Sequence, residues 1–319
     1  MSIISRIMNS NARLYSLYER AKSVTLPGFD SVPLYDVLVF FTNEIRRNVI
    51  SVRAKAIAFT FFLALFPGLI FLFTLIPYIP FHGLQEDLIA FLKELLPIDA
   101  FALLENTIRG VIQEQRGELL SIGLLLALFV STNGVMAMME SFDKTYAVFV
   151  KRNSLVKRWI ALKLTIVIFF LLVISIIAIV EGNQMLKLLL KTFQILTPFN
   201  FILFSALKWL IIILLFFNSI SFIYYYGPAV KKKFRFISAG STLATFLVIL
   251  ISIGFSYFVN NFGNYNRFYG SIGTIIALQI YIFLNAFALL LGFELNASIA
   301  INKNLREHRP TDEVHDGNV

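Results

Sequence analysis

The chain has 319 residues, of which 58% are hydrophobic and only 15% are charged, whereas a soluble domain carries about 25% charged residues. That much apolar surface cannot be buried inside a single globule, so the composition excludes an ordinary soluble protein and indicates a lipid bilayer as solvent. The chain has no cysteine, which excludes disulfides, thiol nucleophiles and cysteine metal ligands.

The first 53 residues are expected to form a cytoplasmic segment that ends in an amphipathic stretch. A secretory signal would place an apolar core near the start, but the first long apolar run begins near Ala54. Between residues 34 and 52, apolar side chains recur at three- and four-residue spacing, and the arginines come late. This pattern predicts an amphipathic helix, either on the membrane surface or packed against the rest of the protein.

Six apolar runs of spanning length follow and define a transmembrane domain over residues 54–299. Each run is near the ~20 residues that a helix needs to cross a bilayer core of about 30 Å. The runs cover residues 54–80, 119–139, 160–180, 201–226, 237–259 and 269–299. The last run is longer than the core requires, so it must tilt or project beyond the lipid. A polar tail, residues 300–319, is expected to be disordered and cytoplasmic.

The connection over residues 81–118 is expected on the outer side and is too apolar for a simple linker. Helical spacing of its apolar residues over 84–95 predicts one short helix, which Pro97 would end. Asp99 is suited to cap a second amphipathic helix that continues to Arg116. The expected fold class is therefore all-α: a polytopic membrane protein with six transmembrane helices plus amphipathic interfacial and periplasmic helices.

The Lys and Arg residues are distributed unequally between the two sides of these spans. Twenty of the 28 lie with the two termini and the connections 140–160 and 227–236, and six lie on the opposite side. Because cytoplasmic loops carry the excess of Lys and Arg, both termini are expected in the cytoplasm. The net charge of +9 is thus a topology signal, and nucleic acid is not an expected partner.

Polar residues within the spans share one depth, close to the cytoplasmic end. Such residues are costly in lipid and usually face a partner or a cavity, so a water-filled polar pocket is predicted, with ordinary interhelical hydrogen bonding as the alternative. Glu294 is expected at or just beyond the cytoplasmic boundary, where it pairs with Lys163 or accepts backbone N–H groups. The predicted pocket residues are Asn133, Lys163, Asn218, Asn285, Glu294 and Asn296.

Two basic clusters border the predicted cytoplasmic surface. Each Lys or Arg near an anionic membrane surface contributes about 1 kcal/mol of attraction, so membrane lipids with anionic headgroups are expected partners. A role in topology alone is the alternative. The candidate headgroup-binding residues are Lys151, Arg152, Lys157, Arg158, Lys231, Lys232, Lys233 and Arg235.

The final third of the chain resembles a known family. "YYYGPAVKKKFRFISAGSTLATFLVILISIGFSYFVNNF" is followed by tyrosine-glycine-serine at 269–271 and by "LGFELN" at 291–296. These segments are similar to the YihY/virulence factor BrkB family, in which alanine is common where this chain has Phe293. "AKAIAFTFFLALFP" and "STNGVMAMMESFDKTYAV" resemble the first two spans of the family, so the resemblance covers about residues 40–300.

The resemblance implies an integral protein of the bacterial inner membrane with six spans. The family carries an old ribonuclease label, a link to serum resistance, and a suggested link of some relatives to lipid or lipopolysaccharide export. The residues themselves argue against a nuclease, because the chain contains no HxH, HExxH or DxD motif for a metal. Neither a cofactor nor a metal is expected.

The function expected from the sequence is that of a transporter, or of a protein that handles lipid or another envelope component, with a polar pocket facing the cytoplasm. It is not expected to be an enzyme. The alternative is a structural or scaffold subunit of an envelope complex, for which envelope proteins would be the partners. Small residues at four-residue steps in span two support that alternative, because they let helices approach closely.

Overall fold

The computed structural model describes residues 24–47, 50–78, 84–95, 117–180, 198–260 and 263–308, and a few positions between 101 and 110. Its described helices are α3 (Leu34–Arg47), α4 (Ile50–Leu75), η1 (Ile76–Tyr78), α5 (Leu84–Leu95), α7 (Gly117–Ser141), α8 (Ser154–Val180), α10 (Pro198–Tyr226), α11 (Ala239–Asn260) and α12 (Gly263–Glu307). The described residues are thus all-α, as the sequence predicts. The first 23 residues, most of the expected helix from Asp99 to Arg116 and the tail beyond residue 308 lie outside the described residues; the positions described between 101 and 110 are helical. Residues 300–307, expected to belong to a disordered tail, instead continue α12 as a helix to Glu307.

Six of these helices are long and apolar enough to cross a membrane: α4, α7, α8, α10, α11 and α12. Each corresponds to one predicted span. Between 17 and 39% of the residues in each apolar stretch are buried, so most of their side chains are at least partly exposed. That distribution is expected of helices whose solvent is lipid, because their backbone groups are already paired within each helix. The chain is therefore a multi-pass membrane protein.

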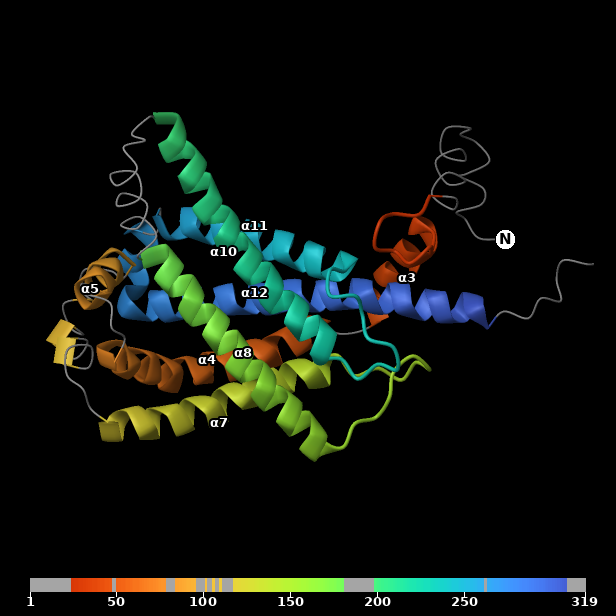
Figure 1. The fold of residues 1–319 in the computed structure, drawn as a ribbon, viewed down its shortest axis with the longest axis horizontal. Helices are drawn as coiled ribbons and strands as arrows, with labels where there is room; N and C mark the ends of the chain where they lie inside the picture. The colour runs from red at the N-terminus through yellow and green to blue at the C-terminus, as the bar shows by residue number, and fades with distance from the viewer. Residues whose placement is uncertain are drawn as a thin grey trace, which may run out of the picture.

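The six long helices pack in a closed order around the bundle. Helix α4 contacts α7, α7 contacts α8, α8 contacts α10, α10 contacts α11, α11 contacts α12, and α12 returns to α4. In Figure 1, α4, α7, α11 and α12 run lengthwise, whereas α8 and α10 cross them obliquely. Helices that are distant in sequence, such as α4 and α12, thus become direct neighbours.

Helices α11 and α12 approach closely because two glycines meet at their crossing. A Cβ atom on Gly240 would lie 2.1 Å from the Gly292 carbonyl oxygen, and one on Gly292 would lie 2.5 Å from the Gly240 carbonyl oxygen. Ala244 is completely buried at the same crossing. Close approach of this kind increases van der Waals contact, which drives helix association where lipid is the alternative neighbour.

Helix α3 packs on the bundle, as one of the two interpretations of its pattern requires. Val37 on its apolar face is fully buried and joins a cluster with Leu295 and Ile299 of α12. Leu38 and Val39 remain 44% and 39% exposed. Because α3 lies beside the C-terminal part of α12 (Figure 1), the two ends of the described chain meet at the same end of the bundle.

Candidate functional site

Two polar connections close this end of the bundle: residues 142–153 between α7 and α8, and residues 227–238 between α10 and α11. An isolated antiparallel bridge joins Phe149 to Val230. The Lys231 N–H donates to the Val148 carbonyl at 2.9 Å. Both predicted basic clusters therefore lie at one end, next to the start of α11 and the last turns of α12.

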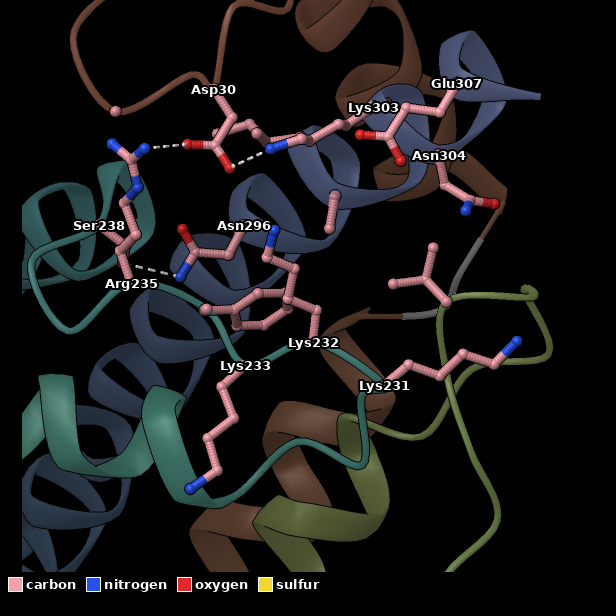
Figure 2. Close-up of a pocket in the computed structure, with 15 residues that line it drawn as sticks. Asp30, Lys231, Lys232, Lys233, Arg235, Ser238, Asn296, Lys303, Asn304 and Glu307 are labelled. Atoms are coloured by element: carbon pink, nitrogen blue, oxygen red, sulfur yellow. Dashed lines mark hydrogen bonds and ion pairs between the residues drawn. The ribbon is translucent and has the colours of Figure 1, made fainter. Parts of the chain in front are cut away.

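A pocket of about 260 Å³ lies between the second connection, α12 and the loop before α3 (Figure 2). We call it the basic pocket, because five basic side chains and only two acidic ones line it. Its lining residues are Gly28, Asp30, Val148, Lys231, Lys232, Lys233, Phe234, Arg235, Ser238, Asn296, Ile299, Ala300, Lys303, Asn304 and Glu307.

The acidic side chain of Asp30 offsets two of the pocket cations. Its carboxylate lies 3.1 Å from the Arg235 guanidinium and 3.1 Å from the Lys303 ammonium. The Lys232 ammonium has no ion pair or hydrogen bond within the described part of the chain. In Figure 2 its side chain points toward Asn296. The pocket therefore holds an excess of positive charge, suited to an anionic group.

Asn296 forms the floor of the basic pocket and fixes the start of α11. Its Oδ1 accepts a hydrogen bond from the Gly240 N–H at 2.8 Å, and its Nδ2 donates to the Ser238 hydroxyl at 2.9 Å. The Ser238 hydroxyl in turn accepts from the Ser241 N–H, as a helix N-cap does. Both polar atoms of the buried Asn296 amide are thus hydrogen-bonded to residues at the start of α11.

A second polar group lies deeper at the same end, and we call it the buried ion cluster: Glu44, Lys144 and Glu294. The Lys144 ammonium lies 2.6 Å from a carboxylate oxygen of Glu44 and 2.6 Å from one of Glu294. Their side chains are 6%, 4% and 1% exposed, respectively. Tyr146 donates its hydroxyl proton to the other oxygen of Glu44 at 2.7 Å. Breaking such a buried pair is expensive, because the remaining charge keeps its desolvation cost.

Glu294 pairs with Lys144, which is neither Lys163 nor a backbone N–H group, the two kinds of partner expected. Lys144, from the connection after α7, occupies the place expected for Lys163, whose position on α8 is exposed. Glu294 is enclosed by protein rather than placed at an open helix end, and α12 continues to Glu307. Burial makes the ionised Glu294 carboxylate unfavourable, because the charge loses its contact with water. The ion pair with Lys144 compensates for that desolvation free energy.

Three of the other predicted pocket residues make hydrogen bonds to partners outside the predicted set. Asn133 accepts a hydrogen bond from the Arg158 guanidinium at 2.6 Å. Asn218 and Asn285 each donate to a carbonyl four residues earlier on their own helix, at 2.8 Å. No hydrogen bond or ion pair joins any two of the six predicted residues within the described ranges, and of the six only Asn296 lines the basic pocket.

The predicted headgroup-binding residues divide into two groups. Lys231, Lys232, Lys233 and Arg235 all line the basic pocket. Lys157 pairs with Asp143 at 2.5 Å, and Arg158 is directed to Asn133 and the Phe129 ring. Lys151 is exposed and lies outside that lining.

Arg152 fastens the two connections together. Its guanidinium donates to the carbonyls of Tyr226, Gly227 and Pro228 at 3.2, 2.9 and 2.8 Å. Burial lowers the pKa of Arg152 from its ordinary value, and the attraction of Asp143 opposes that change. Three carbonyl partners leave this side chain engaged in structure rather than facing a headgroup.

Sequence reasoning missed Glu44, Lys144, Asp30 and Lys303. Glu44 gave a detectable signal, since it follows Val37 by seven residues and Phe41 by three and so lies on the apolar face of α3. An acidic residue on a face that packs against the bundle requires a buried partner. Lys144 gave no comparable signal, because it lies in an irregular connection.

Comparison with known proteins places this architecture in a family. The model of the family described as virulence factor BrkB matches residues 41–316. A ribonuclease-like protein of Bacillus subtilis, YfkH, is 31% identical over 258 residues, covering 81% of this chain and 93% of the relative. A UPF0761 membrane protein of Tolumonas auensis is 23% identical over 281 residues, covering 85% of this chain and 88% of the relative. No solved structure matches the chain.

The ribonuclease-like name belongs to the Bacillus relative. Within the described residues of this chain, no group of three or more His, Cys, Asp or Glu side chains is placed to hold a metal ion. The other relatives carry only membrane-protein names. The match over residues 41–316 and the six apolar helices agree, and this chain belongs to the virulence factor BrkB family of membrane proteins.

Proposed function

We propose that this chain handles a lipid or another envelope component in the bacterial inner membrane and binds its anionic headgroup in the basic pocket. The observation that supports the proposal most directly is the excess of positive charge in that pocket, located where α10, α11 and α12 meet polar connections. A protein that only needed basic loops for topology would not require a cavity between them.

Aromatic residues favour a headgroup-level position for this pocket. The Lys233 ammonium lies 4.4 and 4.5 Å from the ring centroids of Tyr225 and Tyr226 at the end of α10. Tyrosine and tryptophan are enriched at the membrane–water interface, where one end of the side chain is apolar and the other is wet. A cation held against such rings is well placed to meet a lipid phosphate.

The orientation proposed for the chain is the one that the Lys and Arg distribution predicts. Both basic connections and the C-terminal end of α12 lie at one end of the bundle (Figure 1), as that distribution requires. We propose that this end faces the cytoplasm. The pocket would then receive a headgroup from the inner leaflet, which is the leaflet that carries anionic lipid on the cytoplasmic surface.

The first test is direct binding to the purified full-length protein. Short-chain phosphatidylglycerol is titrated into the detergent-solubilised protein by calorimetry, with short-chain phosphatidylcholine as the neutral comparison. Lys232→Gln removes a pocket cation that has no ion pair in the described part of the chain, and should raise the Kd for phosphatidylglycerol about fivefold, the equivalent of ~1 kcal/mol. The matched control is Lys55→Gln, an equal loss of charge at an exposed site on α4 outside the pocket.

Equal effects of the two substitutions would contradict the proposal, since they would indicate attraction by net charge alone. The handling of lipid is then measured in proteoliposomes by the rate at which fluorescent phospholipid moves between leaflets. We expect movement faster than in empty vesicles, and slower with Lys232→Gln than with Lys55→Gln. Rates equal to those of empty vesicles, with phosphatidylglycerol and phosphatidylethanolamine alike, would overturn the lipid-handling function.

A further inference from the structure

The loop before α3 places one carboxylate inside the basic pocket. Asp30 and the next residue, Ser31, both have positive φ angles, 49° and 66°, a backbone conformation that Asp and Asn adopt more readily than most residues. Phe29 and Val32, on either side, are buried, and the Val32 N–H donates to the Phe29 carbonyl at 2.9 Å. The loop is therefore anchored by contacts that do not involve the Asp30 carboxylate.

The Asp30 carboxylate lies between two cations that come from different elements, as Figure 2 shows. Its Oδ1 lies 3.1 Å from the guanidinium of Arg235, in the connection between α10 and α11, and its Oδ2 accepts a hydrogen bond at 3.1 Å from the ammonium of Lys303 on α12. The three side chains are 25%, 68% and 32% exposed, respectively. Partly exposed ion pairs contribute little net free energy, so another anion can replace Asp30 in both of them.

A single carboxylate satisfies this position incompletely. The Oδ1 atom of Asp30 is buried and accepts no hydrogen bond within the described residues, although the Arg235 guanidinium lies close to it. A guanidinium binds best when two of its N–H groups meet two oxygens of a carboxylate or a phosphate. A phosphate group presents more oxygens than a carboxylate, so one phosphate can pair with Arg235 and Lys303 at the same time.

Asp30 is also the acidic residue of the pocket lining that contacts pocket cations directly. Glu307, the other acidic residue of the lining, has no ion pair within the described ranges of the chain. Neither have Lys231 and Lys232. The charge of Asp30 therefore lowers the positive potential of the pocket at the point where two cations converge.

We propose that Asp30 is an internal competitor of the anionic ligand: its carboxylate occupies the position of a phosphate group, and an incoming phosphate takes over Arg235 and Lys303. The inference deepens the proposed function and rests on it for the lipid headgroup as the source of that phosphate. It assigns the regulation of the pocket to Asp30, which keeps the two cations paired in the absence of ligand. Rotation of the Asp30 side chain about χ1 is sufficient to withdraw the carboxylate, so the loop and α3 stay in place.

The first measurement compares two acid-to-amide substitutions that lie six residues apart. Asp30→Asn removes the pocket carboxylate and keeps a residue that tolerates the positive φ. Asp36→Asn is the matched control, because it removes a carboxylate that pairs with Arg306 outside the pocket. When short-chain phosphatidylglycerol is titrated into the detergent-solubilised full-length protein by calorimetry, the Kd for Asp30→Asn should be about fivefold lower than for the parent.

The Kd for Asp36→Asn should stay close to that of the parent. An equal decrease for both variants would overturn the proposal, because net charge alone would then explain it, and so would an unchanged Kd for Asp30→Asn. Thermal unfolding followed by circular dichroism checks that each variant is folded. Asp30→Gly, which also accepts a positive φ, takes the place of Asp30→Asn if the amide variant does not fold.

Coupling between Asp30 and Lys303 separates competition from a purely structural role. In the parent, Lys303 is already paired with Asp30, so Lys303→Gln alone should raise the Kd for phosphatidylglycerol only slightly. In the Asp30→Asn background the ammonium is available to the phosphate, and the same substitution should raise the Kd about fivefold. Equal factors in the two backgrounds would contradict competition, since loss of packing alone predicts no such coupling.

Inorganic phosphate, used as a second probe, separates failure of this proposal from failure of headgroup binding. If the headgroup function is wrong, the parent binds phosphatidylglycerol no more tightly than phosphatidylcholine, yet Asp30→Asn still binds inorganic phosphate more tightly than Asp36→Asn does. If the role of Asp30 is wrong, the parent prefers phosphatidylglycerol, but Asp30→Asn and Asp36→Asn bind either probe equally. Tighter binding by Asp30→Asn of phosphatidylglycerol alone would support the role of Asp30 with the lipid headgroup as the ligand.

Discussion

Lys144 holds two carboxylates from distant parts of the chain, Glu44 and Glu294, in a place that is almost closed to water. Around them, Phe293 stacks on Phe142 with ring centroids 4.3 Å apart. The stability of the fold here depends on Lys144 pairing with both carboxylates. A buried carboxylate without a cation would keep its desolvation cost with nothing to compensate for it.

Replacing Lys144 with Met, which keeps the volume and removes the charge, should lower the free energy of unfolding by about 3–5 kcal/mol. Denaturant unfolding in detergent, followed by circular dichroism, measures the change. Removing both acids as well, in the triple variant Glu44→Gln, Lys144→Met and Glu294→Gln, should restore most of the lost stability. Lys151→Met is the exposed control, and a loss for Lys144→Met no larger than for this control would contradict the assignment.

At the scale of the element, α12 makes several of the contacts that organise this end of the bundle. Gly292 lets α11 approach, Glu294 faces the ion cluster, and Asn296 binds the start of α11. These neighbouring positions project in different directions because successive residues of a helix are rotated by 100°. Residues 292–296 form one motif in the sequence, but in the structure they make three different contacts.

Gly292→Ala should destabilise the packing of α11 on α12 by about 1–3 kcal/mol, the usual cost of overfilling a packed contact. The added methyl would lie 2.5 Å from both the Gly240 carbonyl oxygen and the Tyr224 hydroxyl. Gly254→Ala is the matched control on α11, where nothing lies within 4 Å of the new Cβ. Thermal unfolding midpoints compare the two, and equal midpoints would show that the crossing tolerates a side chain.

On the scale of the whole molecule, the six long helices form a closed ring whose polar and basic connections collect at one end. Lipid-facing side chains on the outside and an ion cluster near one end give the molecule a clear axis. The positive-inside rule assigns a direction to this axis, because Lys and Arg are retained on the cytoplasmic side during insertion.

Cysteine labelling should therefore show that the start of α8 and the end of α12 both face the cytoplasm. A single cysteine at Leu155 or at Leu305, which are 71% and 56% exposed, should resist a membrane-impermeant maleimide in intact spheroplasts and react in inverted vesicles. Lys93→Cys on α5 should show the opposite pattern. Labelling of Leu305→Cys in intact spheroplasts would contradict the proposed orientation.

The sequence by itself determined the class of the fold, the six membrane helices and the family. These are properties of runs of neighbouring residues: the length of an apolar stretch and its period depend on no distant partner. The range 84–95 shows this well, since its spacing predicts a helix and α5 occupies Leu84–Leu95. The "LGFELN" segment likewise carried the resemblance to the family, which the match over residues 41–316 confirms.

Only the tertiary structure decided which polar residues act together. In sequence, Asn285 and Asn296 are equivalent polar interruptions of one apolar helix, yet Asn285 bonds to its own helix and Asn296 to the start of α11. Glu294 finds Lys144, 150 residues away in an irregular connection, rather than Lys163. Pairing depends on the rotation of each helix about its axis and on which connections fold over its end. Those are properties of the packed bundle, and no local pattern specifies them.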